Sequence, residues 1–247
     1  GGVMILPDVR ASFGRDEAAS LVHLLAERGE DSCAWENVLA ERGIDPLLDH
    51  PRIARAVLDG STVSTLPLEV VAYVLLRRCL LDANVDDRLL ADYVTSLFLH
   101  FGHTGRAEKI AAYDDREYRY LVDIVEEMAG AEGRRAFLLR AHLGNLSLWM
   151  SGLFPDRIDH RVHRHGGPGI DYFEKMGQTG FSLAAEDPFA RRSALDDLYR
   201  AAAGAFVPMR RALNGFSDRF LTPRPSSPVD RFLRQARDGF EANRLQA

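Results

Sequence analysis

The chain has 247 residues, 46% of them hydrophobic and 27% charged, which excludes a disordered or fibrous protein and allows a core without disulfides. The net charge of −5 argues against a dedicated nucleic-acid-binding protein, because neutralising phosphates requires a net basic surface or a long basic stripe. Two cysteines, Cys33 and Cys79, are too few for a disulfide framework, so we expect a cytoplasmic protein. The longest apolar stretch, residues 66–81, contains three charged side chains, so we expect no membrane span.

Apolar residues recur at helical spacing in segment after segment, and the period-two alternation of strands is absent. The sequence therefore predicts an all-α protein, a single bundle-like domain of about nine to eleven helices. Ser, Asp, Thr or Pro in front of a segment and Gly behind it give the boundaries. The expected helices, in chain order, cover residues 16–28, 32–43, a short stretch after Pro51, 67–82, 86–101, 114–128, 132–153, 155–165 and 168–176.

Two glycines, Gly177 and Gly180, follow the last of these segments and are expected to end it before a further turn. Four small residues lie within the segment 132–153 and would allow another helix, or a flat ligand, to approach its backbone closely: Gly144, Ser147, Ser151 and Gly152.

Residues 188–221 carry the most regular pattern. Apolar side chains alternate at steps of four and three residues, at Leu195, Tyr199, Ala202, Phe206, Met209, Leu213, Phe216 and Phe220. This seam predicts one long helix, kinked near residues 204–208 because Pro208 removes a backbone hydrogen bond. Such a seam is typical of a helix packed inside its own domain and also of a coiled-coil interface between two chains. Arg210, beside the seam, is expected to be exposed.

The sequence changes character after residue 221. Residues 222–228 are rich in Pro and Ser and predict a linker, and residues 229–247 predict an appended amphipathic helix. The expected organisation is therefore an all-helical domain over 1–221, a linker, and a C-terminal helix.

Candidate ligand-binding residues are His142, Asn145 and Trp149, which lie together on an otherwise apolar helix, and Tyr172, which follows a glycine-rich turn. Buried polar groups need hydrogen-bond partners. His142 and Asn145 therefore form either an internal network or the polar floor of a ligand pocket. The sequence leaves both interpretations open.

Three further histidines, His160, His163 and His165, are the candidates for a metal site, since imidazoles three residues apart on a helix can share one ion. Three arginines are interleaved with them and oppose a bound cation. We therefore expect a solvated basic helix end and no metal.

The motifs of metalloproteases, α/β-hydrolases, kinases, P-loop proteins and dinucleotide-binding enzymes are all missing from the sequence, so it assigns no catalytic residue and no cofactor. The leading hypothesis is a non-catalytic binding or protein-interaction module, with a protein partner or self-association through 188–221 or 229–247. The alternative is a helical enzyme that binds a small molecule or cofactor in a pocket around His142, Asn145 and Trp149.

Overall fold

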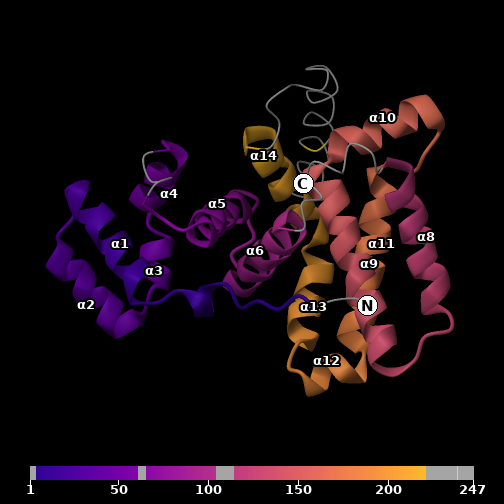
Figure 1. The fold of residues 1–247 in the computed structure, drawn as a ribbon, viewed down its shortest axis with the longest axis horizontal. Helices are drawn as coiled ribbons and strands as arrows, with labels where there is room; N and C mark the ends of the chain where they lie inside the picture. Colours follow the sequence, from indigo (N-terminus) through magenta and orange to yellow (C-terminus); the bar gives the residue numbers. More distant parts are fainter. Residues whose placement is uncertain (1–3, 61–64, 104–113, 221–237, 239–247) are drawn as a thin grey trace, which may run out of the picture. The chain divides into compact units, whose positions relative to one another are not determined.

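The computed structural model describes residues 4–60, 65–103, 114–220 and 238, without the side chains of 103 and 114–120. These residues form thirteen α-helices, one short 3-10 helix and no strand, so the predicted all-α class is confirmed, with more helices than the nine to eleven expected (Figure 1). None of the described helices is long and apolar enough to cross a membrane. The linker 222–228 and, apart from Asp238, the helix 229–247 lie outside the described residues.

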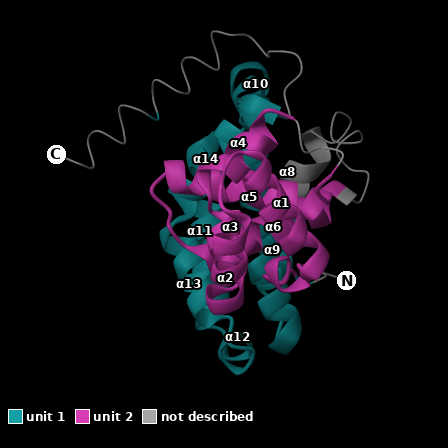
Figure 2. Ribbon diagram, turned by 90° about the vertical axis from the view of Figure 1, so that its left-hand side faces the viewer, with its two compact units in different colours: residues 1–4, 107–247 teal, residues 5–106 magenta. Residues whose placement is uncertain are grey.

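The chain divides into two compact units, shown in different colours in Figure 2. Unit 2 contains residues 5–106, and unit 1 contains residues 1–4 and 107–247. The single domain over 1–221 stays a prediction.

Unit 2 begins with a 3-10 turn and continues with six helices: η1 (Arg10–Ser12), α1 (Arg15–Glu27), α2 (Ser32–Arg42), α3 (Asp45–Leu48), α4 (Pro51–Leu58), α5 (Leu68–Asp82) and α6 (Arg88–His103). Helix α5 is buried around much of its circumference, as its nearly continuous apolar sequence predicts, and it packs against α4 and α6. Gly29 ends α1 in a left-handed conformation with φ +85°, so α2 returns beside α1.

The segment before α1 is held in place by charged hydrogen bonds. Asp92 of α6 is 2% exposed and accepts the backbone N–H of Val9 at 2.9 Å and the Nε–H of Arg10 at 3.2 Å. Burial raises the pKa of Asp92, and these hydrogen bonds oppose the rise. The Nη1 atom of Arg10 donates to both carboxylate oxygens of Asp45 at 2.8 Å. This anchoring sets where Phe13 enters the unit, and its ring meets that of Tyr73 edge-on.

Unit 1 contains seven helices: α8 (Asp114–Met128), α9 (Gly133–Leu153), α10 (Pro155–His165), α11 (Ile170–Glu186), α12 (Pro188–Arg192), α13 (Asp196–Gly204) and α14 (Phe206–Phe220). Helix α9 is the centre, because α8, α11 and α14 all pack against it. Every residue of α9 from Leu143 to Leu153 is buried.

Helices α9 and α11 approach each other backbone to backbone. A Cβ atom on Gly180 would lie 2.6 Å from the backbone nitrogen of Gly144 and 2.8 Å from the carbonyl oxygen of Arg140. A Cβ atom on Gly177 would lie only 2.1 Å from Cε2 of the Phe206 ring. The prediction that Gly177 and Gly180 end a helix is therefore wrong. Both lie inside α11, where they permit close packing.

The expected single long helix over 188–221 is also wrong, because the segment forms α12, α13 and α14. The first break is at Ala194, which takes a positive φ of 54°, and the second is at Ala205. The second break falls within the predicted kink, where Pro208 cannot donate a hydrogen bond to Gly204. The seam residues from Leu195 to Phe216 are nevertheless buried within the chain, while Phe220 is 39% exposed. Self-association through 188–221 stays a prediction.

Arg210 of α14 is the largest fully buried side chain among the described residues, with 1% exposure, so the prediction that it is exposed is wrong. Its Nε–H donates to Glu174 of α11 at 2.9 Å, and its Nη1 donates to Asn214 at 2.8 Å and to Asp238 at 3.2 Å. Asn214 in turn donates to two backbone carbonyls near the end of α9, at 2.8 and 2.7 Å. Arg210 therefore connects α14, α11 and Asp238.

Candidate binding groove

The residues predicted to bind a ligand occupy two helices of unit 1. Asn145 and Trp149 are buried within α9, and His142 of the same helix is partly exposed. Tyr172 lies in the first turn of α11, partly exposed, with its ring edge-on to Phe173. The small residues of α9 receive neighbouring helices, since Phe181 of α11 and Leu213 of α14 lie over Gly144 and Gly152. A ligand site at His142, Asn145, Trp149 and Tyr172 stays a prediction.

The histidines proposed for a metal are all on α10. His160, His163 and His165 are exposed, and the last two lie in the final turn, where basic side chains interact favourably with the helix dipole. Within the described part of the chain, no group of three or more His, Cys, Asp or Glu side chains is placed to hold a metal ion.

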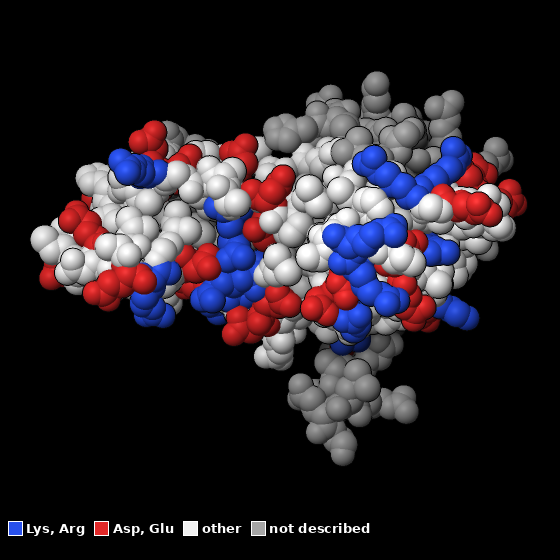
Figure 3. Space-filling model, turned by 90° about the horizontal axis from the view of Figure 1, so that it is seen from below, with Lys and Arg blue, Asp and Glu red and all other residues white. Residues whose placement is uncertain are grey.

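Charged side chains of both signs are mixed on the surface. On the face shown in Figure 3, basic side chains gather in groups that lie directly beside acidic ones.

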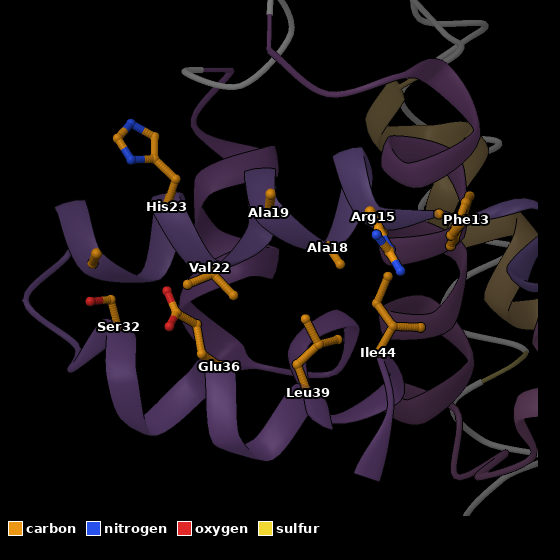
Figure 4. Close-up of a pocket in the computed structure, with 12 residues that line it drawn as sticks. Phe13, Arg15, Ala18, Ala19, Val22, His23, Ser32, Glu36, Leu39 and Ile44 are labelled. Atoms are coloured by element: carbon orange, nitrogen blue, oxygen red, sulfur yellow. The ribbon is translucent and has the colours of Figure 1, made fainter. Parts of the chain in front are cut away.

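A groove of about 790 Å³ lies between α1 and α2 in unit 2 (Figure 4). Its walls and floor are mainly apolar and come from both helices and their flanking segments: Phe13, Ala18, Ala19, Val22, Ala26, Leu39 and Ile44. Polar side chains are few: Arg15 and His23 from α1, and Ser32 and Glu36 from α2. Phe13, Arg15 and Ile44 lie at one end of the groove, and His23 and Ser32 at the other. This combination of apolar surface and a few polar groups is typical of binding sites.

Helix α2 is an unusual wall because none of its residues is buried. Its apolar side chains Trp35, Val38 and Leu39 are only partly covered. Most helices in proteins are stabilised chiefly by burying one apolar face. The apolar side of α2 is therefore incompletely covered by the described residues of its own unit.

Besides packing against α1 and α3, helix α2 is attached through a cluster formed by Glu30, Trp35, His50 and Arg52, which we call the His50 cluster. The rings of Trp35 and His50 meet edge-on, with centroids 4.9 Å apart, and the indole Nε1–H of Trp35 points at Glu30 Oε2, 3.5 Å away. The Nε of Arg52 lies 3.1 Å from Glu30 Oε1. The Nδ1 atom of His50 accepts the backbone N–H of Arg52 at 3.1 Å and so caps α4.

No pattern in the sequence pointed to the groove. The helices α1 and α2 were expected nearly as they are, and their apolar residues are plain in the sequence. Which of those residues stay uncovered depends on the angle and spacing of the two helices, and no local pattern encodes that. Comparison of the chain with protein-family models, curated proteins and solved structures found no match.

Proposed function

We propose that this protein is a non-catalytic helical binding module whose α1–α2 groove takes an amphipathic helix from a partner protein. The observation that carries the proposal is an apolar groove with one wall, α2, that has no buried residue. A helix laid into such a groove would cover the apolar surface that α2 leaves exposed, and this is a common mode of peptide recognition.

The charges at the groove specify the partner further. Neither Arg15 nor Glu36 makes an ion pair with any described residue. A complementary helix carries an apolar stripe, an acidic side chain opposite Arg15 and a basic one opposite Glu36. The thirteen residues of α1 set the length of the wall at about 20 Å, which corresponds to a partner helix of three to four turns.

Selection from a displayed library of amphipathic helical peptides of about 14 residues tests the proposal. Peptides enriched on the full-length protein are expected to share the apolar stripe and the two charges, and to bind Ala19→Gln at least tenfold more weakly. Ala19 is exposed and lines the groove, so glutamine there obstructs the site without disturbing the core. Fluorescence anisotropy of labelled peptides measures the affinities.

Ala40→Gln is the matched control, because Ala40 is exposed on α2 and is not among the residues that line the groove. It is expected to leave peptide affinity unchanged. The proposal fails if no peptide is enriched, or if the enriched peptides bind Ala19→Gln as well as they bind the unmodified protein.

A further inference from the structure

The His50 side chain is placed so that its protonation state matters to the groove. Its Nδ1 accepts a hydrogen bond from the backbone of Arg52, so this nitrogen carries no proton, and the proton of the neutral ring is on Nε2. Nε2 lies 3.9 Å from Glu30 Oε1. Adding a second proton turns Nδ1 into a donor, which leaves two N–H groups facing each other at the first turn of α4.

The charged groups around His50 do not compensate for the loss of this hydrogen bond on protonation. Burial lowers the pKa of His50, Glu30 opposes that change, and Arg52 adds to it. The side chain is 16% exposed. The neighbouring Asp49 is engaged by Arg77 of α5 and Arg88 of α6, with its carboxylate oxygens 3.1 and 2.9 Å from their nitrogens. The folded cluster therefore favours the neutral imidazole.

Trp35 transmits the state of His50 to α2. The indole contacts the His50 ring and Glu30, and it shares a side of α2 with the groove residues Ser32 and Leu39, one helical turn away in either direction. The other attachments of α2, its contacts with α1 and α3, leave none of its residues buried. Disturbing the His50 cluster therefore loosens the wall of the groove.

We propose that His50 makes the α1–α2 groove pH-dependent, with α2 held in place while the imidazole is neutral and released when it takes up a second proton. The expected consequence is weaker binding of the partner helix at acidic pH, and this part of the inference rests on the proposed function. The movement of α2 itself does not depend on any partner.

The lowered pKa of His50 determines in which direction the stability of the cluster changes with pH. The unfolded chain binds the proton more readily than the folded cluster, so the cluster is fully stable above the ordinary histidine pKa of about 6.5. Its stability is lost as the pH falls from there through the lower pKa of the folded state. The transition therefore has its midpoint below about pH 6.5.

A spin label on Cys33 measures the release directly, because Cys33 is exposed on α2. The full-length protein carries Cys79→Ala so that only Cys33 reacts. The mobility of the label is expected to rise on acidification, with a midpoint below pH 6.5. In His50→Asn the rise should disappear, since asparagine is a good helix cap and does not titrate. Glu30→Gln should keep the rise and move its midpoint to lower pH.

His23→Gln is the control, since His23 is the histidine that lines the groove itself, lies exposed on α1 and is not part of the His50 cluster. It should leave the mobility titration unchanged. The proposal is overturned if the label's mobility does not depend on pH, if the titration persists in His50→Asn, or if it disappears in His23→Gln.

A parallel measurement separates this inference from the proposed function. The most enriched peptide of the selection should bind at least fivefold more weakly at pH 5.5 than at pH 7.5, and equally at both values in His50→Asn. If no peptide binds at any pH, the proposed function fails, while the spin label still decides the role of His50. If a peptide binds equally at both values in the unmodified protein, the pH dependence of the groove is refuted.

Discussion

The substitution Gly180→Ala is expected to lower the free energy of unfolding of unit 1 by about 3 kcal/mol, the upper end of the usual cost of overpacking. The added methyl group would lie 2.6 Å from the backbone nitrogen of Gly144 and 2.8 Å from the carbonyl oxygen of Arg140. A side chain can rotate away from such a contact, but the backbone of α9 cannot. The only relief is to separate α9 from α11, which opens the centre of the unit.

Urea unfolding measures this cost in a Trp35→Phe background, where Trp149 on α9 is the only tryptophan and reports on unit 1. Gly215→Ala is the matched control. Gly215 also lies inside a helix, but a Cβ atom there would meet nothing within 4 Å, so alanine should stabilise α14 by about 0.5–1 kcal/mol. Similar effects of the two substitutions would show that the close approach of α9 and α11 does not limit stability.

Gly177 and Gly180 show what local sequence can and cannot predict. Helical spacing and boundary residues located most helices to within two residues, because the pattern of apolar side chains reflects burial along one element. A glycine, by contrast, fits both a helix end and a close helix crossing. At Gly180 the neighbouring helix α9 decides between the two, and at Gly177 the ring of Phe206 in α14 does; both partners lie about thirty residues or more away in the sequence.

The two helix breaks in the segment 188–221 also differ in whether local sequence predicts them. Pro208 marks one break in the sequence, because proline cannot donate the required hydrogen bond. The other break, at Ala194, has no such signal, since alanine is a strong helix former and rarely takes a positive φ. There the backbone N–H of Leu195 bonds to the carbonyl of Ala190 at 2.8 Å and closes α12. Packing of the seam overrides the local helix preference.

The candidate site depended still more on tertiary structure. Single polar residues on an apolar helix pointed to His142 and Asn145, yet the groove with incompletely covered apolar walls lies in the other unit, between α1 and α2. The groove has no motif, because its character comes from apolar residues that the fold leaves uncovered. The His50 cluster likewise joins residues from three segments, and neither His50 nor Glu30 lies in a recognisable pattern.

Arg210 provides the second large effect. Arg210→Ala is expected to lower the free energy of unfolding of unit 1 by about 3–5 kcal/mol, the usual cost of removing one partner of a buried ion pair. The guanidinium is 1% exposed, and its Nη2 lies 2.7 Å from Glu174. Without it, the carboxylates of Glu174 and Asp238 and the amide of Asn214 lose a charged partner in a site that water reaches poorly, so the two carboxylates are left largely unsolvated.

Two further substitutions separate charge from packing at this position. Arg200→Ala removes an arginine of α13 that is 63% exposed and ion-paired to neighbouring aspartates, and it should change stability by less than about 0.5 kcal/mol. Glu174→Gln in the Arg210→Ala protein removes one of the two stranded carboxylates and should recover part of the loss, because a neutral amide costs less to bury than an unpaired charge. Urea unfolding at Trp149 measures all three. Equal losses for Arg200→Ala and Arg210→Ala, or no recovery in the double variant, would refute a buried ion pair as the source of the stability.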